Sequence, residues 1–235
     1  MPEMVPEVVE QKFVFPIHYR DELLAWATYA LEPDPGHSGG VVHSLYYDTP
    51  DLELYSQKRN SEFLKYKVRL RWYDDAGALP PDARVPCFLE VKRKIGAARR
   101  KRRTTADLPA AVLAGSPFDS PEVSALAGVA LEIGFAAQGP LVPMALIRYH
   151  RMRFVDPATG ARIALDGEIG CQAVNRAFLP AEAPIVLDTG VLEIKGTARH
   201  LPPSLEPVAF LLTKSSFSKY AQCLEHLLHP AGVRI

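Results

Sequence analysis

Strict alternation of charged and apolar side chains marks one segment of the chain, Lys65–Trp72. It reads Lys-Tyr-Lys-Val-Arg-Leu-Arg-Trp. Successive side chains of a β-strand point to opposite faces of the sheet, so this segment places four cations on one face and four apolar or aromatic side chains on the other. The pattern predicts a strand of an antiparallel sheet with one face in the core and a charged second face.

Similar but less regular alternation occurs in other segments that are bounded by turn residues such as Asp74-Asp75-Ala76-Gly77. In other segments the apolar residues recur at helical spacing. In the segment nearest the C-terminus they form one stripe along the expected helix. We predict strands at Val8–Phe15, Val42–Tyr47, Lys65–Trp72, Cys87–Ile95, Ile147–Phe154, Arg162–Ile169 and Val191–Thr197. We predict helices at Ile17–Leu31, within Asp107–Ala137 and at Phe217–Leu228.

The polar faces of these strands carry far more cations than acids. For any single strand, a solvated charged face is the commoner interpretation, but like charges that face each other across strands are destabilising. The set therefore indicates binding of a strong polyanion, with acids that suit a divalent metal, and closing the sheet into a barrel would concentrate the field. The cations are Lys12, Lys65, Lys67, Arg69, Arg71, Lys92, Lys94, Arg151, Arg153, Arg162 and Lys195, and the acids are Glu10, Glu90, Asp166, Glu168 and Glu193.

Charge and composition narrow the function classes. The 27 basic and 27 acidic residues cancel, although residues 58–103 alone carry fifteen basic and five acidic side chains, a net charge of +10. The neutral total and the lack of an aromatic stacking platform argue against a nucleic-acid binder. No apolar run could span a bilayer, and the N-terminus is unlike a signal peptide, so we expect a cytoplasmic protein. We expect a single domain over residues 1–235. No P-loop motif occurs, which excludes a nucleotide site of that kind.

Eight short motifs, taken in order, resemble the VTC domain, the catalytic domain of vacuolar transporter chaperone polyphosphate polymerases, within the triphosphate tunnel metalloenzyme (CYTH-like) superfamily. The similarity begins at Glu10-Gln11-Lys12-Phe13 and extends to the C-terminal helix. The motifs are Ser44-Leu45-Tyr46-Tyr47-Asp48-Thr49, Lys67-Val68-Arg69-Leu70-Arg71, Phe88-Leu89-Glu90-Val91-Lys92, Lys101-Arg102-Arg103, Tyr149-His150-Arg151, Arg162-Ile163-Ala164-Leu165-Asp166, Leu192-Glu193-Ile194-Lys195, and Lys214 with Ser218-Lys219-Tyr220.

The resemblance implies an α+β fold: an antiparallel, roughly eight-stranded β-barrel that forms a triphosphate tunnel, with helices packed outside. It implies Arg69, Arg71, Lys92, Arg151, Arg162 and Glu193 as the catalytic residues. Further phosphate ligands would be Lys12, Lys67, Lys101 or Arg103, Lys195, Lys214, Ser218 and Lys219. A divalent metal, Mn²⁺ or Mg²⁺, would bind Glu193 as its principal ligand, with Glu10, Glu90 or Glu168 as further ligands.

Two departures from the superfamily pattern bear on the expected function. The N-terminal ExExK signature is reduced, with Val8 in place of the first Glu, as in VTC-type members. The chain also lacks the SPX domain and the transmembrane segment of the eukaryotic polymerases, so we expect any membrane coupling to come from a separate membrane protein.

The expected reaction is transfer of the ATP γ-phosphate to a growing polyphosphate chain. Phosphoryl transfer depends on positioning and charge neutralisation, and an ionised phosphate acceptor needs no general base. Two alternatives stay open at this point: an inorganic triphosphatase or polyphosphatase that uses the same tunnel, and a module that binds polyphosphate without turnover. The oligomeric state is not indicated.

Overall fold

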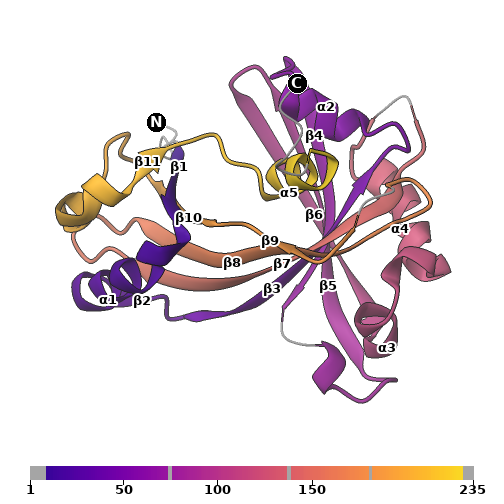
Figure 1. Ribbon diagram of the computed structural model, residues 1–235, viewed down its shortest axis with the longest axis horizontal. Coiled ribbons are helices and arrows are strands. Elements are labelled where there is room, and N and C mark those ends of the chain that lie inside the picture. The colour runs from indigo at the N-terminus through magenta and orange to yellow at the C-terminus, as the bar shows by residue number, and fades with distance from the viewer. Residues whose placement is uncertain (1–8, 74–75, 137–138, 180–181, 230–235) are drawn as a thin grey trace, which may run out of the picture. The chain divides into compact units, whose positions relative to one another are not determined.

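A computed structural model describes residues 9–73, 76–136, 139–179 and 182–229 (Figure 1). Val8, Asp74 and Asp75, which the sequence places at a strand start and in a turn, lie outside these ranges. The strands are β1 (Val9–Pro16), β2 (Glu32–Pro33), β3 (Gly39–Asp48), β4 (Leu64–Tyr73), β5 (Arg84–Ile95), β6 (Ala98–Pro109), β7 (Val142–Val155), β8 (Arg162–Val174), β9 (Ile185–Val186), β10 (Thr189–Gly196) and β11 (Thr213–Lys214). The α-helices are α1 (Arg20–Ala30), α2 (Glu53–Arg59), α3 (Ala110–Ala114), α4 (Pro121–Glu132) and α5 (Lys219–Leu228). Short 3₁₀ helices are η1 (Ile17–Tyr19), η2 (Ala76–Ala78), η3 (Pro117–Asp119) and η4 (Pro203–Leu211).

The strands form one antiparallel-rich sheet with the hydrogen-bonded order β11-β1-β10-β8-β7-β3-β4-β5-β6, while β2 pairs with β7 and β9 with β8. Every pairing with a defined register is antiparallel. Among the described residues, eight strands are longer than two residues. An antiparallel α+β fold is thus confirmed. No pairing within the described ranges joins β11 to β6, so closure into a barrel stays a prediction.

The chain divides into two compact units, each described separately below. Unit 1 contains residues 1–40, 149–169 and 186–218, and unit 2 contains residues 41–148, 170–185 and 219–235. Strands β3, β7 and β8 each contribute residues to both units. The interpretation of residues 1–235 as one domain stays a prediction.

The core of unit 2 lies on one face of β4, β5 and β6. Its β4 contribution is the apolar half of the alternating segment, because Tyr66, Val68, Leu70 and Trp72 are all buried there. Helices α3 and α4 cover this face (Figure 1), and α4 buries Val123, Leu126 and Ala130 against it. Burying one such apolar side chain stabilises the fold by about 1.5–3 kcal/mol. This burial fixes the opposite faces of the same strands as polar.

The core of unit 1 follows the same rule on β1, β8 and β10. Phe13 and Phe15 of β1 are buried with the apolar residues of β8 and β10. Helix α1 packs Leu23 and Ala27 onto them. The residues that alternate with this set, beginning with Glu10 and Lys12, therefore belong to the other face.

Helices α2 and α5 are fixed by one buried carboxylate, that of Asp48 at the end of β3. Its Oδ1 accepts hydrogen bonds from the backbone N–H groups of Thr49 and Leu54, at 2.8 and 2.7 Å. Its Oδ2 accepts from the Tyr55 N–H at 2.9 Å and from the Tyr220 hydroxyl at 2.8 Å. The buried Tyr220 thereby ties α5 to the start of α2. Asp48 and Tyr220, which are far apart in the sequence, are thus in direct contact.

Several predicted elements differ from the structure. Residues 98–109 form strand β6, where we predicted no strand, whereas α3 and α4 lie within the range Asp107–Ala137 for which helices were predicted. Helix α2 was absent from the prediction. Among the described residues, no helix has the length and apolar character needed to cross a bilayer.

Candidate functional site

A grid of cations occupies the polar face of β4, β5 and β6 in unit 2. The register pairs Lys67 of β4 with Lys92 of β5, and Lys92 with Lys101 of β6. The next row along the strands joins Arg69, Glu90 and Arg103. Directly opposed residues lie about 4.5–5.5 Å apart at Cβ, so three ammonium groups share one short row. The predicted alternation is confirmed for β4 and for Glu90 of β5, because Val68, Leu70, Leu89 and Val91, which flank Arg69 and Glu90 along the chain, are in the core.

Glu90 lies at the centre of this grid. Its carboxylate is 3% exposed, and its Oε2 accepts from Arg69 Nε at 2.7 Å and Arg69 Nη2 at 2.6 Å. Lys101 forms an ion pair with Oε1. Burial raises the pKa of Glu90, but the charges of Arg69, Arg71 and Lys101 outweigh it and hold that pKa well below its usual range. Glu90 therefore stays ionised and fixes the Arg69 guanidinium on the polar face.

Aromatic and hydroxyl groups orient the other arginines of this face. Arg71 Nε lies 3.4 Å from Ser44 Oγ, on the neighbouring strand β3. The Arg103 guanidinium lies 3.5 Å from the centre of the Phe88 ring, a cation–π distance. Arg69 Nη1 also donates to the Tyr46 hydroxyl at 3.3 Å. Planar guanidinium groups held in this way are suited to bidentate contacts with phosphate oxygens.

Unit 1 presents a second charged face, on β1, β10 and β8. Its register pairs Glu10 with Lys195 and Lys195 with Arg162 in one row. In the next row Lys12 pairs with Glu193. The predicted phosphate ligands Lys12, Arg162 and Lys195 thus come together on one side of this sheet.

Glu193 and Glu10 share one lysine in this face. Lys12 Nζ lies 3.1 Å from Glu10 Oε1 and 3.6 Å from Glu193 Oε2. Lys195 Nζ lies 2.7 Å from the other Glu193 oxygen, Oε1. Burial raises the pKa of Glu193, but the charges of Lys12, Lys195 and Arg151 outweigh it and lower the pKa well below its usual range. Glu193 is therefore a buried, permanently ionised carboxylate.

Arg151 is held in position by Asp166, which the sequence placed only among the acids of the polar faces that suit a divalent metal. Arg151 Nε and Nη2 donate to the two Asp166 oxygens at 2.6 and 2.7 Å. Asp166 is fully buried. Burial lowers the pKa of Arg151, but the Asp166 charge outweighs it, so the pKa lies above its usual range and the guanidinium stays charged. Alternation had placed Asp166 on the same face as Arg162, which was the available signal.

A divalent metal fits the Glu10 and Glu193 pair. Mg²⁺ sites commonly use one or two carboxylates and complete the octahedron with substrate phosphates and water. The Lys12 ammonium already lies within ion-pair reach of both carboxylates, so their geometry is one that attracts a cation. The described ranges contain no cluster of three or more metal-binding side chains.

Glu168 differs from the prediction that placed it beside Asp166 on the charged face. Its φ of 52° is left-handed and interrupts the extended alternation of β8. Its oxygens lie 3.3 Å from Arg20 Nη1 and 3.4 Å from His150 Nε2. These partners are separate from those of Glu193, so the structure gives Glu168 no contact that supports a role in the same metal site.

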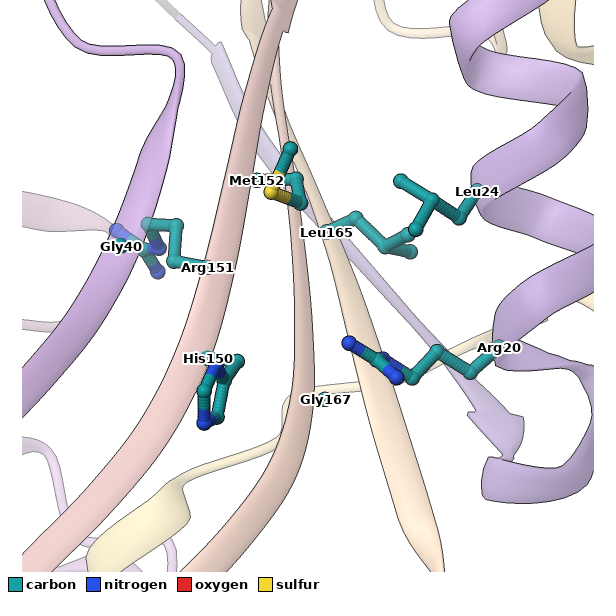
Figure 2. A pocket seen from close by; sticks show the side chains of 8 residues that line it. All are labelled: Arg20, Leu24, Gly40, His150, Arg151, Met152, Leu165 and Gly167. Atoms are coloured by element: carbon teal, nitrogen blue, oxygen red, sulfur yellow. The ribbon is translucent and has the colours of Figure 1, made fainter.

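Arg20 and His150 also line a small cavity of about 50 Å³ in unit 1. Figure 2 shows Arg20 and Leu24 of α1 pointing toward the strands that carry Met152 and Leu165. The cavity is completed by Gly40, Arg151 and Gly167. Its volume is too small for a nucleoside triphosphate.

Three predicted phosphate ligands lie near the C-terminus, and their contacts differ from those of the charged faces. They are Lys214, Ser218 and Lys219. Lys214 pairs with Phe13, which belongs to the core face of β1. Its ammonium donates to Gln11 Oε1 at 3.2 Å, so it lies with the residues that alternate with Lys12. Ser218 is buried immediately before α5, and Lys219 is the first residue of that helix. Their roles stay predictions.

The model of the VTC domain family matches residues 8–228, nearly the whole chain. No match was found among curated protein sequences.

Two solved bacterial structures match the chain over most of its length. One, from Bacillus halodurans, is described as a "putative adenylate cyclase"; it has 13% sequence identity and a TM-score of 0.51, and the match covers 91% of this chain and 95% of that one. The other, from Vibrio parahaemolyticus and described in the same words, has 13% identity and a TM-score of 0.40, with 93% and 97% covered. The first likeness supports the fold.

Proposed function

Because the chain belongs to the VTC domain family, whose tunnel-type members handle phosphate substrates, we propose that it is a metal-dependent polyphosphate polymerase. In this proposal it transfers the γ-phosphate of ATP to a growing polyphosphate chain inside a cationic tunnel. ATP and polyphosphate are the proposed partners, and the enzyme class is a phosphotransferase.

The observation that carries the proposal is the row formed by Lys67, Lys92 and Lys101. Like charges that face each other directly across strands are destabilising, by up to about 1 kcal/mol for each opposed pair, and this row contains two such pairs, Lys67 with Lys92 and Lys92 with Lys101. A row of this kind is useful when a polyanion lies along it, because linked phosphates neutralise several ammonium groups at once. The neighbouring row adds Arg69 and Arg103, whose guanidinium groups can hold phosphate oxygens in pairs.

The proposed reaction breaks the bond between the γ-phosphorus and the oxygen that bridges it to the β-phosphate. A new bond forms between the γ-phosphorus and a terminal oxygen of the polyphosphate acceptor. That oxygen is already ionised near pH 7, so no side chain has to remove a proton. The polymer gains one phosphate, and ADP leaves with the bridging oxygen.

The tasks of single residues in this proposal are those that the family resemblance implies, and the contacts within each unit support them separately. Arg69, Arg71 and Lys92 clamp the triphosphate of ATP, and Glu90 keeps Arg69 oriented. Arg151, positioned by Asp166, and Arg162 neutralise the acceptor phosphates. The contact of Lys214 with Gln11 gives it no support as an acceptor ligand.

Glu193, with Glu10, would hold the Mn²⁺ or Mg²⁺ ion. The ion, when bound, would supply positive charge that offsets the charge of the phosphates and of the leaving ADP. Lys12 and Lys195, which contact Glu193, would supply further positive charge for phosphate.

Product analysis tests the proposal. The purified protein is incubated with ATP and Mn²⁺, and the products are separated by size. Long-chain polyphosphate with an equal release of ADP is expected. Orthophosphate as the only product would assign the protein to the hydrolases, and tight polyphosphate binding without turnover would make it a binding module.

A further inference from the structure

One end of unit 2 combines exposed apolar side chains with a dense ring of cations. We define the hairpin tip as residues 58–65 and 93–100, the end of α2 with the segment that follows it, and the turn between β5 and β6. These two segments contain seven Lys and Arg residues and a single acid, Glu62, a net charge of +6. No task in the proposed reaction uses the apolar residues found there.

The apolar residues of the hairpin tip form one group. Phe63 is 72% exposed, and Leu64 and Ile95 are also exposed. Leu64 and Ile95 are direct cross-strand partners. The Gly96 N–H donates to the Phe63 carbonyl at 2.9 Å, and a Cβ added to Gly96 would lie 2.8 Å from the Phe63 ring. The ring is therefore packed against the turn, with most of its surface in water.

Cations surround this group on both faces of the hairpin. Lys65, Lys94 and Arg99 share one row across β4, β5 and β6. On the other face Arg93 pairs with Arg100. Lys94 directly precedes Ile95 and Lys65 directly follows Leu64, and these two lysines are cross-strand partners. The apolar group therefore lies at the end of the hairpin, with cations in the row directly behind it.

We propose that the hairpin tip binds the surface of a bilayer that contains anionic lipids. Phe63, Leu64 and Ile95 insert among the headgroups, and the surrounding Lys and Arg side chains contact lipid phosphates. Neither half of the patch would suffice alone, because basic clusters are attracted to anionic surfaces but do not anchor there without an apolar component. The inference is independent of the reaction that the protein catalyses.

Charge complementarity and shape favour lipid over other polyanions. A free polyphosphate chain would use the cations but would leave Phe63 and Ile95 without a role. An acidic peptide would bind its apolar residues in a groove, whereas these side chains project from a turn. Both of these ligands are outcomes that the experiment separates.

Vesicle flotation is the test. The protein is mixed with vesicles of phosphatidylcholine alone, or of equal parts phosphatidylcholine and phosphatidylglycerol. Binding is expected only to the anionic vesicles. Phe63→Ser should weaken it by roughly tenfold or more, the loss expected when a buried Phe side chain is removed. Reversing two charges with Arg59→Glu and Arg100→Glu should weaken it by at least about 25-fold, since each cation contributes about fivefold.

Matched control variants change the same chemistry elsewhere. Phe210 is 83% exposed on η4, and Arg176 is exposed in unit 2, so Phe210→Ser and Arg176→Glu should bind as the wild type does. A second readout uses Phe63→Trp, whose fluorescence should shift to the blue and be quenched by brominated phosphatidylglycerol.

Several results would overturn the proposal. One is no binding to either vesicle. Another is binding that Phe63→Ser leaves intact while the charge reversals abolish it, which would indicate adhesion by charge alone. Polyphosphate or poly-glutamate binding that depends on Arg59 and Arg100, without vesicle binding, would assign the hairpin tip to a soluble partner instead.

Discussion

Two buried carboxylates organise the charged faces at the scale of single residues. Glu90 is contacted by Arg69 and Lys101, and Glu193 by Lys12 and Lys195. In both cases burial alone would favour protonation, and the surrounding cations reverse that preference. The same cations are the ones available to phosphate, so each carboxylate keeps its neighbours oriented before a ligand arrives.

Replacing Glu193 with Gln separates its two effects. Metal-dependent turnover should fall by about 100-fold or more, because the amide is a poor metal ligand. Binding of tripolyphosphate without metal should become tighter, because Lys12 and Lys195 lose their competing anion. Turnover with a Mn²⁺ titration and calorimetric binding measure these effects. Glu206→Gln, an exposed site in the same unit, is the control. Unchanged metal dependence would remove Glu193 from the metal site.

Glu90 should produce a pH dependence of stability with a definite sign. Its pKa is lower in the folded than in the unfolded protein, where it is about 4.3. The ion pairs therefore stabilise the fold above that value, and this contribution is lost as pH falls through the lowered pKa. Relative to wild type, Glu90→Gln should lower Tm at pH 7, and the difference should narrow from pH 5 toward pH 2. Calorimetry across this range checks it, with exposed Glu132→Gln as control. A constant difference would contradict the assignment.

At the scale of elements, strand register brings together side chains that are distant in sequence. The β4-β5-β6 ladder places Lys67, Lys92 and Lys101 in one row. In unit 1, the β1-β10 ladder places Lys12 opposite Glu193. Helices cover the other faces and leave these rows polar.

Lys92→Met tests whether this row binds phosphate. Without ligand, the change in the free energy of unfolding combines two opposite effects, because a like charge leaves the row and the interaction that Lys92 makes in the fold is lost. The rise in Tm that tripolyphosphate causes in the wild type should shrink, since ligand stabilisation follows affinity. Thermal unfolding with and without tripolyphosphate measures both. An undiminished ligand effect would exclude this row from the binding site, and Arg176→Met controls for the loss of a surface charge.

Tyr220→Phe tests how α5 is attached. It removes the hydroxyl donor to Asp48 Oδ2, which then keeps only the Tyr55 N–H. A buried acceptor that loses a partner costs about 1–3 kcal/mol. Urea unfolding should show this loss, whereas Tyr29→Phe, at an exposed tyrosine, should leave the unfolding free energy unchanged. Equal stability of both variants would contradict the proposed attachment.

The sequence predicts elements well where the pattern is local. Lys65–Trp72 alternates strictly, and its apolar half is in the core. Strand β6 was missed because Arg99–Arg103 has no apolar alternation, and its pairing with β5 supplies the missing signal. Helix α2 depends on Asp48 and on the left-handed Leu52, neither of which a periodicity search detects. The same holds for Glu168, whose positive φ redirects its side chain toward Arg20.

At the scale of the whole molecule, a net charge of zero conceals strongly charged faces. The predicted ligands Arg69, Lys92, Lys101 and Arg103 come together in unit 2, and Lys12, Lys195 and Glu193 in unit 1. The role of Asp166 could not be predicted, because it depends on a bidentate contact with Arg151 across two strands. Family membership then connects these faces to phosphate chemistry.

The most direct test of the central claim is the product formed from ATP and Mn²⁺ by the wild-type protein, with Glu193→Gln in parallel. The account predicts long-chain polyphosphate and one ADP for each phosphate added by the wild type, and almost no product from the variant. Release of orthophosphate without polymer, or equal activity of the two proteins, would contradict it.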